Sequence, residues 1–214
     1  MGGSPVENPF HGSGPDLKLI ETLLWDGSDL IRLPRHLARL SQSAARLGWP
    51  CDPVAAETAL QQAAPMGPTR MRLTLDSSGT VEVTTGALAP TPPLWRVALA
   101  DARIASDDPW LSVKSTHRAL YDQSRAALPP GIDELIFLNE RDQICEGTIT
   151  NIFYDLGDGL CTPPLTCGLL PGVLRGEMLA LGQCRERVLH LSELPRARIW
   201  MGNSLRGLIP AELT

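Results

Sequence analysis

The stretch LIFLNERDQICEGTITNIFYDLGDGLCTPPLTCGLLPGVLRGEM (residues 135–178) carries the strongest fold signal in this chain. Short apolar runs separated by polar and glycine-containing turns predict a meander of short strands. Residues 169–172 then predict the start of a helix, where backbone N–H groups have no partner within the helix. Glu146 ends one predicted strand, directly before Gly147. The stretch therefore predicts a carboxylate and an anion-binding helix start in one place.

A lysine stands upstream of this stretch. Lys114 lies 32 positions before Glu146, at the expected polar start of a helix, and Lys18 is the only other lysine in the chain. A lysine amine, a carboxylate and an anion-binding helix N-terminus are what a pyridoxal 5′-phosphate (PLP) site requires, because the protein must hold, orient and tune that cofactor. The sequence therefore predicts a PLP site.

Composition and charge narrow the class of protein. The 214 residues are 43% hydrophobic and 20% charged, a balance typical of soluble globular proteins, and the net charge of −5 gives no global attraction to nucleic acid or to an anionic membrane. No apolar run reaches the roughly 18 residues of a membrane span, and the first residues lack a signal-peptide pattern.

The cysteines point to a reducing compartment. There are five of them, scattered and without a C-x-x-C pair, which favours reduced thiols in the cytoplasm over a disulfide framework or a metal site. They are Cys51, Cys145, Cys161, Cys167 and Cys184.

The order of predicted elements indicates a mixed α+β fold with two lobes. Residues 1–15, with four Gly, three Pro and two Ser, are expected to be a flexible arm. A small α/β lobe is expected over residues 16–88, and a larger lobe over residues 95–214 that carries most of the PLP site. The proline-rich linker at residues 89–93 separates them.

Periodicity and capping residues place the individual elements. Apolar residues recur at helical spacing from Leu33 to Leu47, between Pro34 in the first turn and Gly48 as the stop. Helices are predicted at residues 33–47, 52–64, 115–128 and 171–182, strands at residues 17–25, 95–100 and 198–202, and a hairpin at residues 71–85.

The chemistry of PLP suggests a role for each polar group. The lysine must present a neutral amine, and His117 and Arg118, close to Lys114 in sequence, disfavour its charged form. Glu146 is placed to keep the pyridine nitrogen of PLP protonated. The helix start after Gly172, with an arginine such as Arg39, offers a phosphate site.

Each residue also has an ordinary structural explanation. Arg39 shares a helix with Arg35 and Arg46, which predicts a solvated basic face. Cys145 is expected to be a small core residue rather than a nucleophile. His36 and His117 are expected at the surface or as capping residues.

Seven short blocks, in this order, resemble the class IV aminotransferase family, the fold-type IV PLP enzymes. The family includes branched-chain aminotransferases, D-amino-acid aminotransferases and 4-amino-4-deoxychorismate lyases, and the resemblance covers residues 17–213. The blocks are I-E-T (20–22), H-L-A-R-L (36–40), S-A-x-x-L-G (43–48), E-G-T-I-T-N-I-F (146–153), T-P-P-L (162–165), L-P-G-V-L-R (170–175) and M-G-N-S (201–204).

The resemblance implies a role for individual residues. Lys114 corresponds to the catalytic Schiff-base lysine and Glu146 to the partner of the pyridine nitrogen. Arg39 corresponds to the phosphate-binding arginine, and Ser204 to a hydroxyl that contacts the cofactor. Further cofactor contacts are implied for Asn151 and for the backbone of Val173 and Leu174. Tyr121 is a candidate for the cofactor's phenolic oxygen, although its spacing from Lys114 differs from the aminotransferase pattern.

Three segments resemble 4-amino-4-deoxychorismate lyases in particular. They are LIETLLW (19–25), KSTHRALYD (114–122) and MGNSLRGLIPA (201–211). The resemblance implies removal of a ring proton by Lys114, loss of pyruvate, and formation of 4-aminobenzoate for folate synthesis. Arg206 is a candidate for binding a substrate carboxylate, because a guanidinium matches two oxygens; the alternative is a surface ion pair.

Two other functions remain open. A class IV aminotransferase acting on branched-chain or D-amino acids would use the same cofactor residues. The family-like sequence begins shortly before Glu21, without the usual strand pair and glycine-aromatic segment, so a non-catalytic truncated homologue that binds PLP or a partner is the third possibility. The resemblance further implies a homodimer and possible association with an aminodeoxychorismate synthase.

Overall fold

The computed structural model describes residues 10, 14 and 16–214 of the chain. The predicted flexible arm, residues 1–15, therefore lies outside the described residues except at two positions. One of these, Phe10, is buried with its ring 5.1 Å from that of Trp110. Among the helices of the described part, none is long and apolar enough to cross a membrane.

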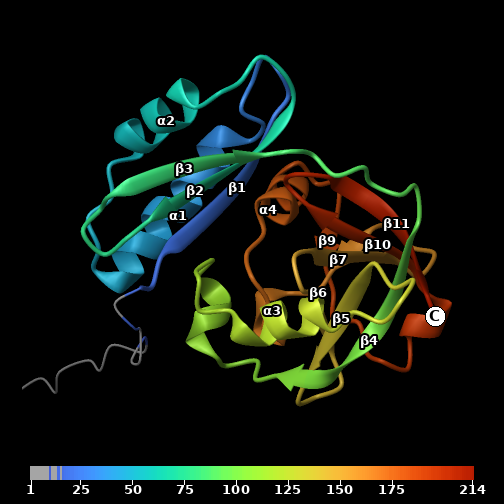
Figure 1. Ribbon diagram of the computed structural model, residues 1–214. Helices are drawn as coiled ribbons and strands as arrows, with labels where there is room; N and C mark the ends of the chain where they lie inside the picture. Colours follow the sequence, from blue (N-terminus) through green and yellow to red (C-terminus); the bar gives the residue numbers. More distant parts are fainter. Residues whose placement is uncertain (1–9, 11–13, 15) are drawn as a thin grey trace, which may run out of the picture.

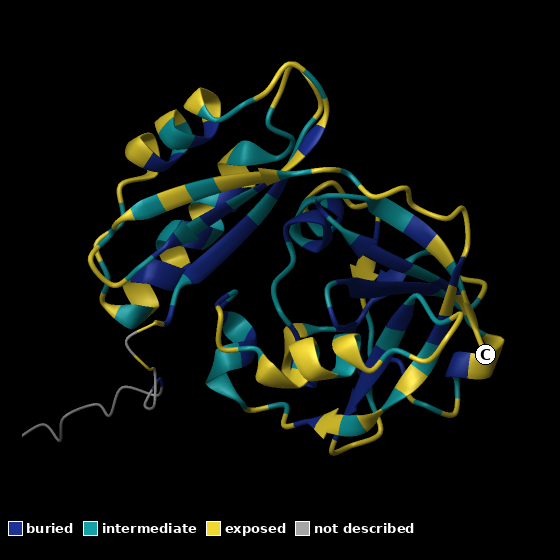
Figure 2. Ribbon diagram, in the orientation of Figure 1, coloured by how far each residue is buried: buried dark blue, intermediate teal, exposed yellow. Residues whose placement is uncertain are grey.

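The first sheet has three antiparallel strands in the order β1-β2-β3. Helices α1 and α2 cover one of its faces, and α2 turns an exposed side to solvent (Figures 1 and 2). Their apolar side chains meet those of β1 and β2 in one core. The elements are β1 (Leu19–Trp25), α1 (Leu33–Leu47), α2 (Pro53–Gln62), β2 (Thr69–Leu75) and β3 (Val81–Gly86).

The boundaries of these elements follow from the residues predicted to set them. Helix α1 ends at Gly48, whose φ of 70° is a left-handed conformation that glycine adopts without steric cost. The Asp52 carboxylate accepts hydrogen bonds from the N–H groups of Val54 and Ala55 at the start of α2. The predicted strand, both helices and the hairpin in this part of the chain are confirmed.

The second sheet has eight strands and closes on itself. Its order is β10-β11-β4-β5-β6-β7-β8-β9, and β10 also pairs with β7. The interior holds a core that includes Val97, Ile136, Ile152 and Met201. The strands are β4 (Trp95–Ile104), β5 (Glu134–Asn139), β6 (Ile144–Gly147), β7 (Asn151–Asp155), β8 (Cys161–Thr162), β9 (Arg185–Glu186), β10 (Arg198–Asn203) and β11 (Gly207–Leu213).

Two α-helices and three short 3₁₀-helices join these strands. Helix α4 lies beside the closed sheet, next to the turn that follows β10 (Figure 1). The helices are α3 (Ala119–Ala126), α4 (Val173–Ala180), η1 (Pro109–Ser112), η2 (Leu165–Cys167) and η3 (Leu194–Arg196). Since β3 ends at Gly86 and β4 begins at Trp95, the linker runs between the two sheets; the division into two lobes stays a prediction.

The prediction that Lys114 stands at a helix start is wrong. Helix α3 begins at Ala119 rather than at residue 115, and Lys114 lies in an extended segment before it. The backbone here pairs with β1 instead: the N–H of Ile20 donates to the Lys114 carbonyl (2.9 Å), and the N–H of Thr116 donates to the Lys18 carbonyl (2.8 Å). This long-range pairing supplies hydrogen-bond partners for the Lys114 carbonyl and the Thr116 N–H, so this segment needs no helix to satisfy them.

Candidate active site

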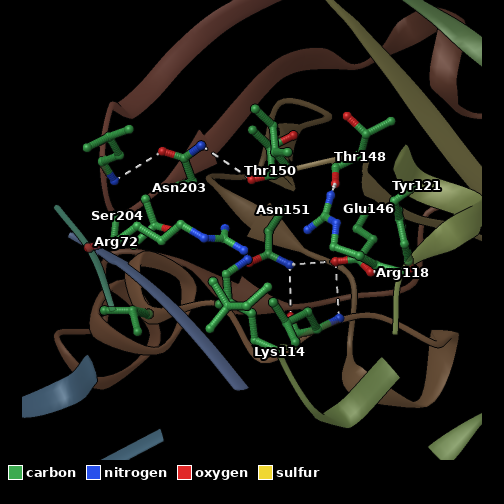
Figure 3. Close-up of a pocket in the computed structure, with 18 of the residues that line it drawn as sticks. Arg72, Lys114, Arg118, Tyr121, Glu146, Thr148, Thr150, Asn151, Asn203 and Ser204 are labelled. Carbon is green, nitrogen blue, oxygen red and sulfur yellow. Dashed lines mark hydrogen bonds between the residues drawn. The ribbon is translucent and has the colours of Figure 1, made fainter. Parts of the chain in front are cut away.

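A cavity of about 500 Å³ lies between the two sheets and collects most of the predicted site residues. Its walls come from β1, α1 and β2 on one side, and from the β6–β7 turn, the start of α4 and the β10–β11 turn on the other. Lys114 and α3 close one end. Figure 3 shows this arrangement, with Lys114, Glu146, Asn151 and Ser204 around one space.

Lys114 presents its amine to this cavity. Among the described residues its Nζ has no hydrogen-bond or ion-pair partner. Arg39 and Arg118 line the same cavity. Burial, followed by repulsion from these two arginines, lowers the pKa of Lys114 from 10.5 to about 8. A substantial fraction of the amine is therefore neutral near physiological pH, as a nucleophile or base requires.

Glu146 occupies the opposite wall, at the end of β6. It is 5% exposed, and its two oxygens accept hydrogen bonds from the Tyr121 hydroxyl (2.7 Å) and the N–H of Leu170 (3.1 Å). Burial raises the pKa of Glu146 to about 7, against the lowering effect of these hydrogen bonds. A cationic group bound next to this carboxyl would lower its pKa and so favour its ionised form.

Tyr121 is placed by α3 and by its ring contacts. Its ring lies edge-on to Phe137, with centroids 5.2 Å apart, and the guanidinium of Arg118 is 5.7 Å from its centroid. The hydroxyl donates to Glu146, so the structure gives this residue a partner other than the cofactor oxygen suggested by the sequence. Tyr121 thus positions the carboxylate.

The helix start that the sequence predicts after Gly172 is present: α4 begins at Val173, and its N-terminus lies at the cavity. Gly172 is its N-cap and supplies no side chain, so the N–H groups of Val173 and Leu174 in the first turn are not capped by one. A Cβ on residue 172 would stand 1.8 Å from Oδ1 of Asn151. The Asn151 amide in turn donates to the Leu170 carbonyl (3.0 Å), which ties this loop to β7.

Arg39 reaches the same helix start from α1. Its Nη1 donates to the Pro171 carbonyl (3.2 Å), while Nε and Nη2 donate to the two oxygens of Glu21 (2.8 and 2.6 Å). The alternative of a solvated basic face is wrong for this residue, because the bidentate pair with Glu21 draws it inward, where its side chain is 11% exposed.

His36 is buried, which corrects the expectation of a surface or capping residue. It is 1% exposed, with Nδ1 2.6 Å from Glu21 Oε2 and Nε2 2.8 Å from Ser204 Oγ. Burial lowers the pKa of His36, whereas Arg39 and His36 hold the pKa of Glu21 at about 2 although burial opposes its ionisation. The neutral imidazole of His36 then donates a hydrogen bond from Nδ1 to the Glu21 carboxylate and accepts one at Nε2 from the Ser204 hydroxyl.

Sequence reasoning did not assign Glu21 and His36 to the site. Two signals were available: a carboxylate inside an otherwise apolar strand, and the three-residue spacing that puts His36 and Arg39 on one face of α1. Together with Ser204 they link the first sheet to the β10–β11 turn of the second.

Arg206 also lies in the cavity wall. The Asn203 side chain holds its turn by accepting from the N–H groups of Leu205 (3.1 Å) and Arg206 (2.9 Å). The alternative of a surface ion pair is wrong, since within the described residues Arg206 has no acidic partner and its Nε is buried without a hydrogen bond. Cys145 is buried in an apolar cluster, as predicted, and burial raises the pKa of its thiol above the ordinary value.

Comparison with known proteins identifies the family. The amino-transferase class IV family model matches residues 18–213, so the chain belongs to that family of PLP-dependent enzymes and is itself an enzyme. A Schizosaccharomyces pombe protein provisionally named an aminodeoxychorismate lyase is 29% identical over 176 residues, covering 78% of this chain and 75% of its own.

Solved structures share the fold. A Mesorhizobium loti protein provisionally described as an amino-acid aminotransferase is 43% identical with a TM-score of 0.88, and the match covers 93% of this chain and 100% of that one. The 4-amino-4-deoxychorismate lyase from Pseudomonas aeruginosa is 24% identical with a TM-score of 0.77, covering 92% of this chain and 82% of that one. The fold-type IV α+β architecture predicted from the sequence is confirmed.

Proposed function

We propose that this enzyme is a PLP-dependent 4-amino-4-deoxychorismate lyase that releases pyruvate and 4-aminobenzoate. The observation that carries the PLP chemistry is the Lys114 amine, which has no partner within the described part of the chain and lies in a cavity that also holds Glu146 and the α4 start. The donor set fits PLP, since it combines an amine of lowered pKa, a buried carboxyl and a helix N-terminus backed by an arginine.

We assign the cofactor contacts accordingly. Lys114 would hold the aldehyde end and Glu146 the pyridine nitrogen. The N–H groups of Val173 and Leu174, with Arg39, would hold the phosphate. Ser204, which is hydrogen-bonded to His36, would lie near the phosphate. Asn151 would fix the position of the loop between Glu146 and the phosphate site, since its amide donates to the Leu170 carbonyl.

Bound PLP supplies an electron sink that stabilises negative charge on the carbon attached to the substrate nitrogen. Lys114, with a pKa of about 8, is suited to take the proton from that ring carbon. The C–O bond on the neighbouring ring carbon then breaks and the ring becomes aromatic. The leaving group departs as enolpyruvate, which takes a proton on its methylene carbon to become pyruvate. Tyr121 keeps Glu146 in place throughout, because its hydroxyl donates to the carboxylate.

One comparison supports the lyase within the family: the S. pombe relative carries a lyase name. Arg206 lies in the cavity wall, and among the described residues its buried Nε has no hydrogen-bond partner, so it is free to bind a substrate carboxylate. Amino acids carry a carboxylate too, so Arg206 fits the substrates of both candidate reactions.

An aminotransferase is the second candidate. The observation that favours it is the 43% identity to the M. loti structure, which is provisionally described as an amino-acid aminotransferase. The two reactions differ in one measurable way. An aminotransferase converts PLP to its amine form when it is given an amino acid alone, whereas the lyase reaction leaves the cofactor unchanged.

We further propose a homodimer, association with an aminodeoxychorismate synthase, and a cytoplasmic location. The five cysteines are free thiols, which agrees with a reducing compartment. Light scattering of the purified protein tests the first of these, and co-purification with a synthase tests the second.

The deciding experiment uses 4-amino-4-deoxychorismate made in situ and follows 4-aminobenzoate and pyruvate. We expect equal amounts of the two from the PLP-loaded enzyme and none from Lys114→Ala, while Lys18→Ala, the only other lysine variant, stays active. Absence of 4-aminobenzoate together with PLP-to-amine conversion by an amino acid would establish the aminotransferase instead.

A further inference from the structure

Positive side chains dominate the wall of the cavity that holds Lys114. Six arginines and this lysine line it, against two acidic residues, Asp122 and Glu146, although the whole chain has a net charge of −5. A concave surface of one sign concentrates ligands of the opposite sign. The arginines are Arg39, Arg70, Arg72, Arg118, Arg125 and Arg206.

These arginines divide into a paired and an unpaired set. Three have acidic partners: Arg39 with Glu21 (2.6 Å), Arg118 with Asp122 (2.7 Å) and Arg125 with Glu134 (3.6 Å). In the part of the chain that the structure describes, Arg70, Arg72 and Arg206 have none. We call these three the open arginines.

The fold brings the open arginines to the cavity from both sheets. Side chains alternate along β2, so Met71 and Leu73 enter the core under α1 and α2 while Arg70 and Arg72 occupy the opposite face. Arg206 comes from the turn between β10 and β11, which Asn203 holds in shape. Figure 3 labels Arg72 on the same side of the cavity as Ser204, away from Glu146.

Two of the open arginines, Arg72 and Arg206, are partly buried at a cost that an anionic ligand would relieve, whereas Arg70 is exposed. Burial lowers the pKa of Arg206, and repulsion from Arg125 and Arg70 adds to this effect. The pKa of Arg72 is lowered by burial and by Arg118 and Arg70. A buried guanidinium Nε with no hydrogen-bond partner is rare in folded proteins unless something else binds to it.

We propose that Arg70, Arg72 and Arg206 form a second anion site, separate from the phosphate site at Arg39, and that the substrate is an amine with two carboxylates. The two oxygens of one carboxylate accept two parallel hydrogen bonds from one guanidinium group. A single carboxylate therefore cannot pair in this way with all three open arginines. The inference deepens the proposed lyase function and rests on it for the amine. It also separates the substrate from amino acids that carry one carboxylate.

A pair of aromatic acids that differ by one carboxylate tests the site without any reaction. Calorimetry compares the dissociation constants of isophthalate and benzoate for the PLP-loaded protein, and for protein given inorganic phosphate in place of PLP. We expect isophthalate to bind at least about tenfold more tightly, with a preference that weakens as salt increases.

Arginine variants locate the site. Arg72→Gln and Arg206→Gln should reduce the preference to within about threefold. Arg35→Gln should keep it, because Arg35 is exposed on α1 outside the cavity wall. Urea unfolding confirms that each variant is folded.

Two results would overturn the second anion site: equal binding of the two acids, or a preference that survives both cavity variants. The outcome is independent of the lyase test. If isophthalate is preferred but no 4-aminobenzoate forms, the site stands and the substrate is another dicarboxylate amine. If 4-aminobenzoate forms without the preference, the lyase stands and the site does not.

Discussion

At Lys114, the neutral amine that the reaction requires conflicts with the stability of the folded protein. Burial in the cavity keeps the Lys114 amine partly neutral, and the positive charges of Arg39 and Arg118 add to this effect. The same desolvation makes the charged form unfavourable in the folded state, and therefore lowers stability wherever the unfolded chain would be protonated. Active-site residues commonly carry this kind of cost.

Replacement of Lys114 by methionine should therefore stabilise the PLP-free protein at pH 7, by about 1–3 kcal/mol. The folded-state pKa is about 8 and the ordinary value is 10.5. The folded state thus binds fewer protons between these values, and the stability of the unmutated protein rises with pH across this window. The gain from Lys114→Met should accordingly shrink as pH rises from 8 towards 10.5. Urea unfolding at several pH values measures it.

Lys18→Met is the matched control. Lys18 is partly exposed and pairs with the exposed Glu82, so its loss should change stability by no more than about 0.5 kcal/mol. A Lys114→Met variant no more stable than the unmutated protein at pH 7 would contradict the account of a desolvated amine.

At the scale of elements, Glu21 fastens α1 to β1 and, through His36 and Arg39, to the second sheet. Its carboxylate meets both partners at 2.6 Å while it is 3% exposed. Breaking one side of a buried charged pair leaves the other charge uncompensated, which is strongly destabilising.

Glu21→Gln should lower the free energy of unfolding by about 2–4 kcal/mol at pH 7. The folded-state pKa of Glu21 is about 2, below its ordinary value of 4.5. Its contribution is therefore fully present above pH 4.5 and is lost as pH falls towards 2, so the difference between variant and unmutated protein should narrow in acid. Glu82→Gln, in an exposed pair, should cost less than about 0.5 kcal/mol. Equal effects of the two variants would refute the role of Glu21.

Helix α4 provides a second contrast at this scale, between two of its glycines. A Cβ at Gly172 would meet Asn151 Oδ1 at 1.8 Å, whereas nothing lies within 4 Å of one at Gly176. Gly172→Ala should push the helix start away from Arg39, weakening PLP binding by about tenfold and lowering stability by about 1–3 kcal/mol. Gly176→Ala should add about 0.5–1 kcal/mol, because alanine favours a helix.

Fluorescence titration with PLP and urea unfolding measure both effects. The double variant Gly172→Ala, Asn151→Ala removes the clashing oxygen and should recover part of the stability. No loss of PLP affinity in Gly172→Ala would show that the α4 start does not hold the phosphate.

At the scale of the molecule, the cavity exists because two sheets meet across it. Local patterns predicted most elements of both, since alternation, caps and turn residues act over a few positions. They missed the extended conformation of Lys114, because its cause is pairing with β1 about a hundred residues away in sequence. Strand β11 was also missed. It forms a hairpin with β10, its neighbour in the chain, and its parallel pairing with β4 is a long-range effect.

The site was predictable to the extent that motifs carry it. Lys114, Glu146, Arg39 and the α4 start line one cavity, as their motifs indicated. Burial of His36 and the open state of Arg70 and Arg72 could not be predicted, because each depends on which residues of the other sheet or helix approach it. No local pattern shows that an arginine lacks a partner.

The central claim is that Lys114 is the residue to which PLP binds covalently. Sodium borohydride fixes PLP to the lysine that holds it, and peptide mass spectrometry then locates the added mass. The chain offers only two lysines, so the assignment is unambiguous. We predict the modification on the Lys114 peptide, its retention in Lys18→Ala and its loss in Lys114→Ala. Modification of Lys18 alone, or of neither lysine, would contradict the account.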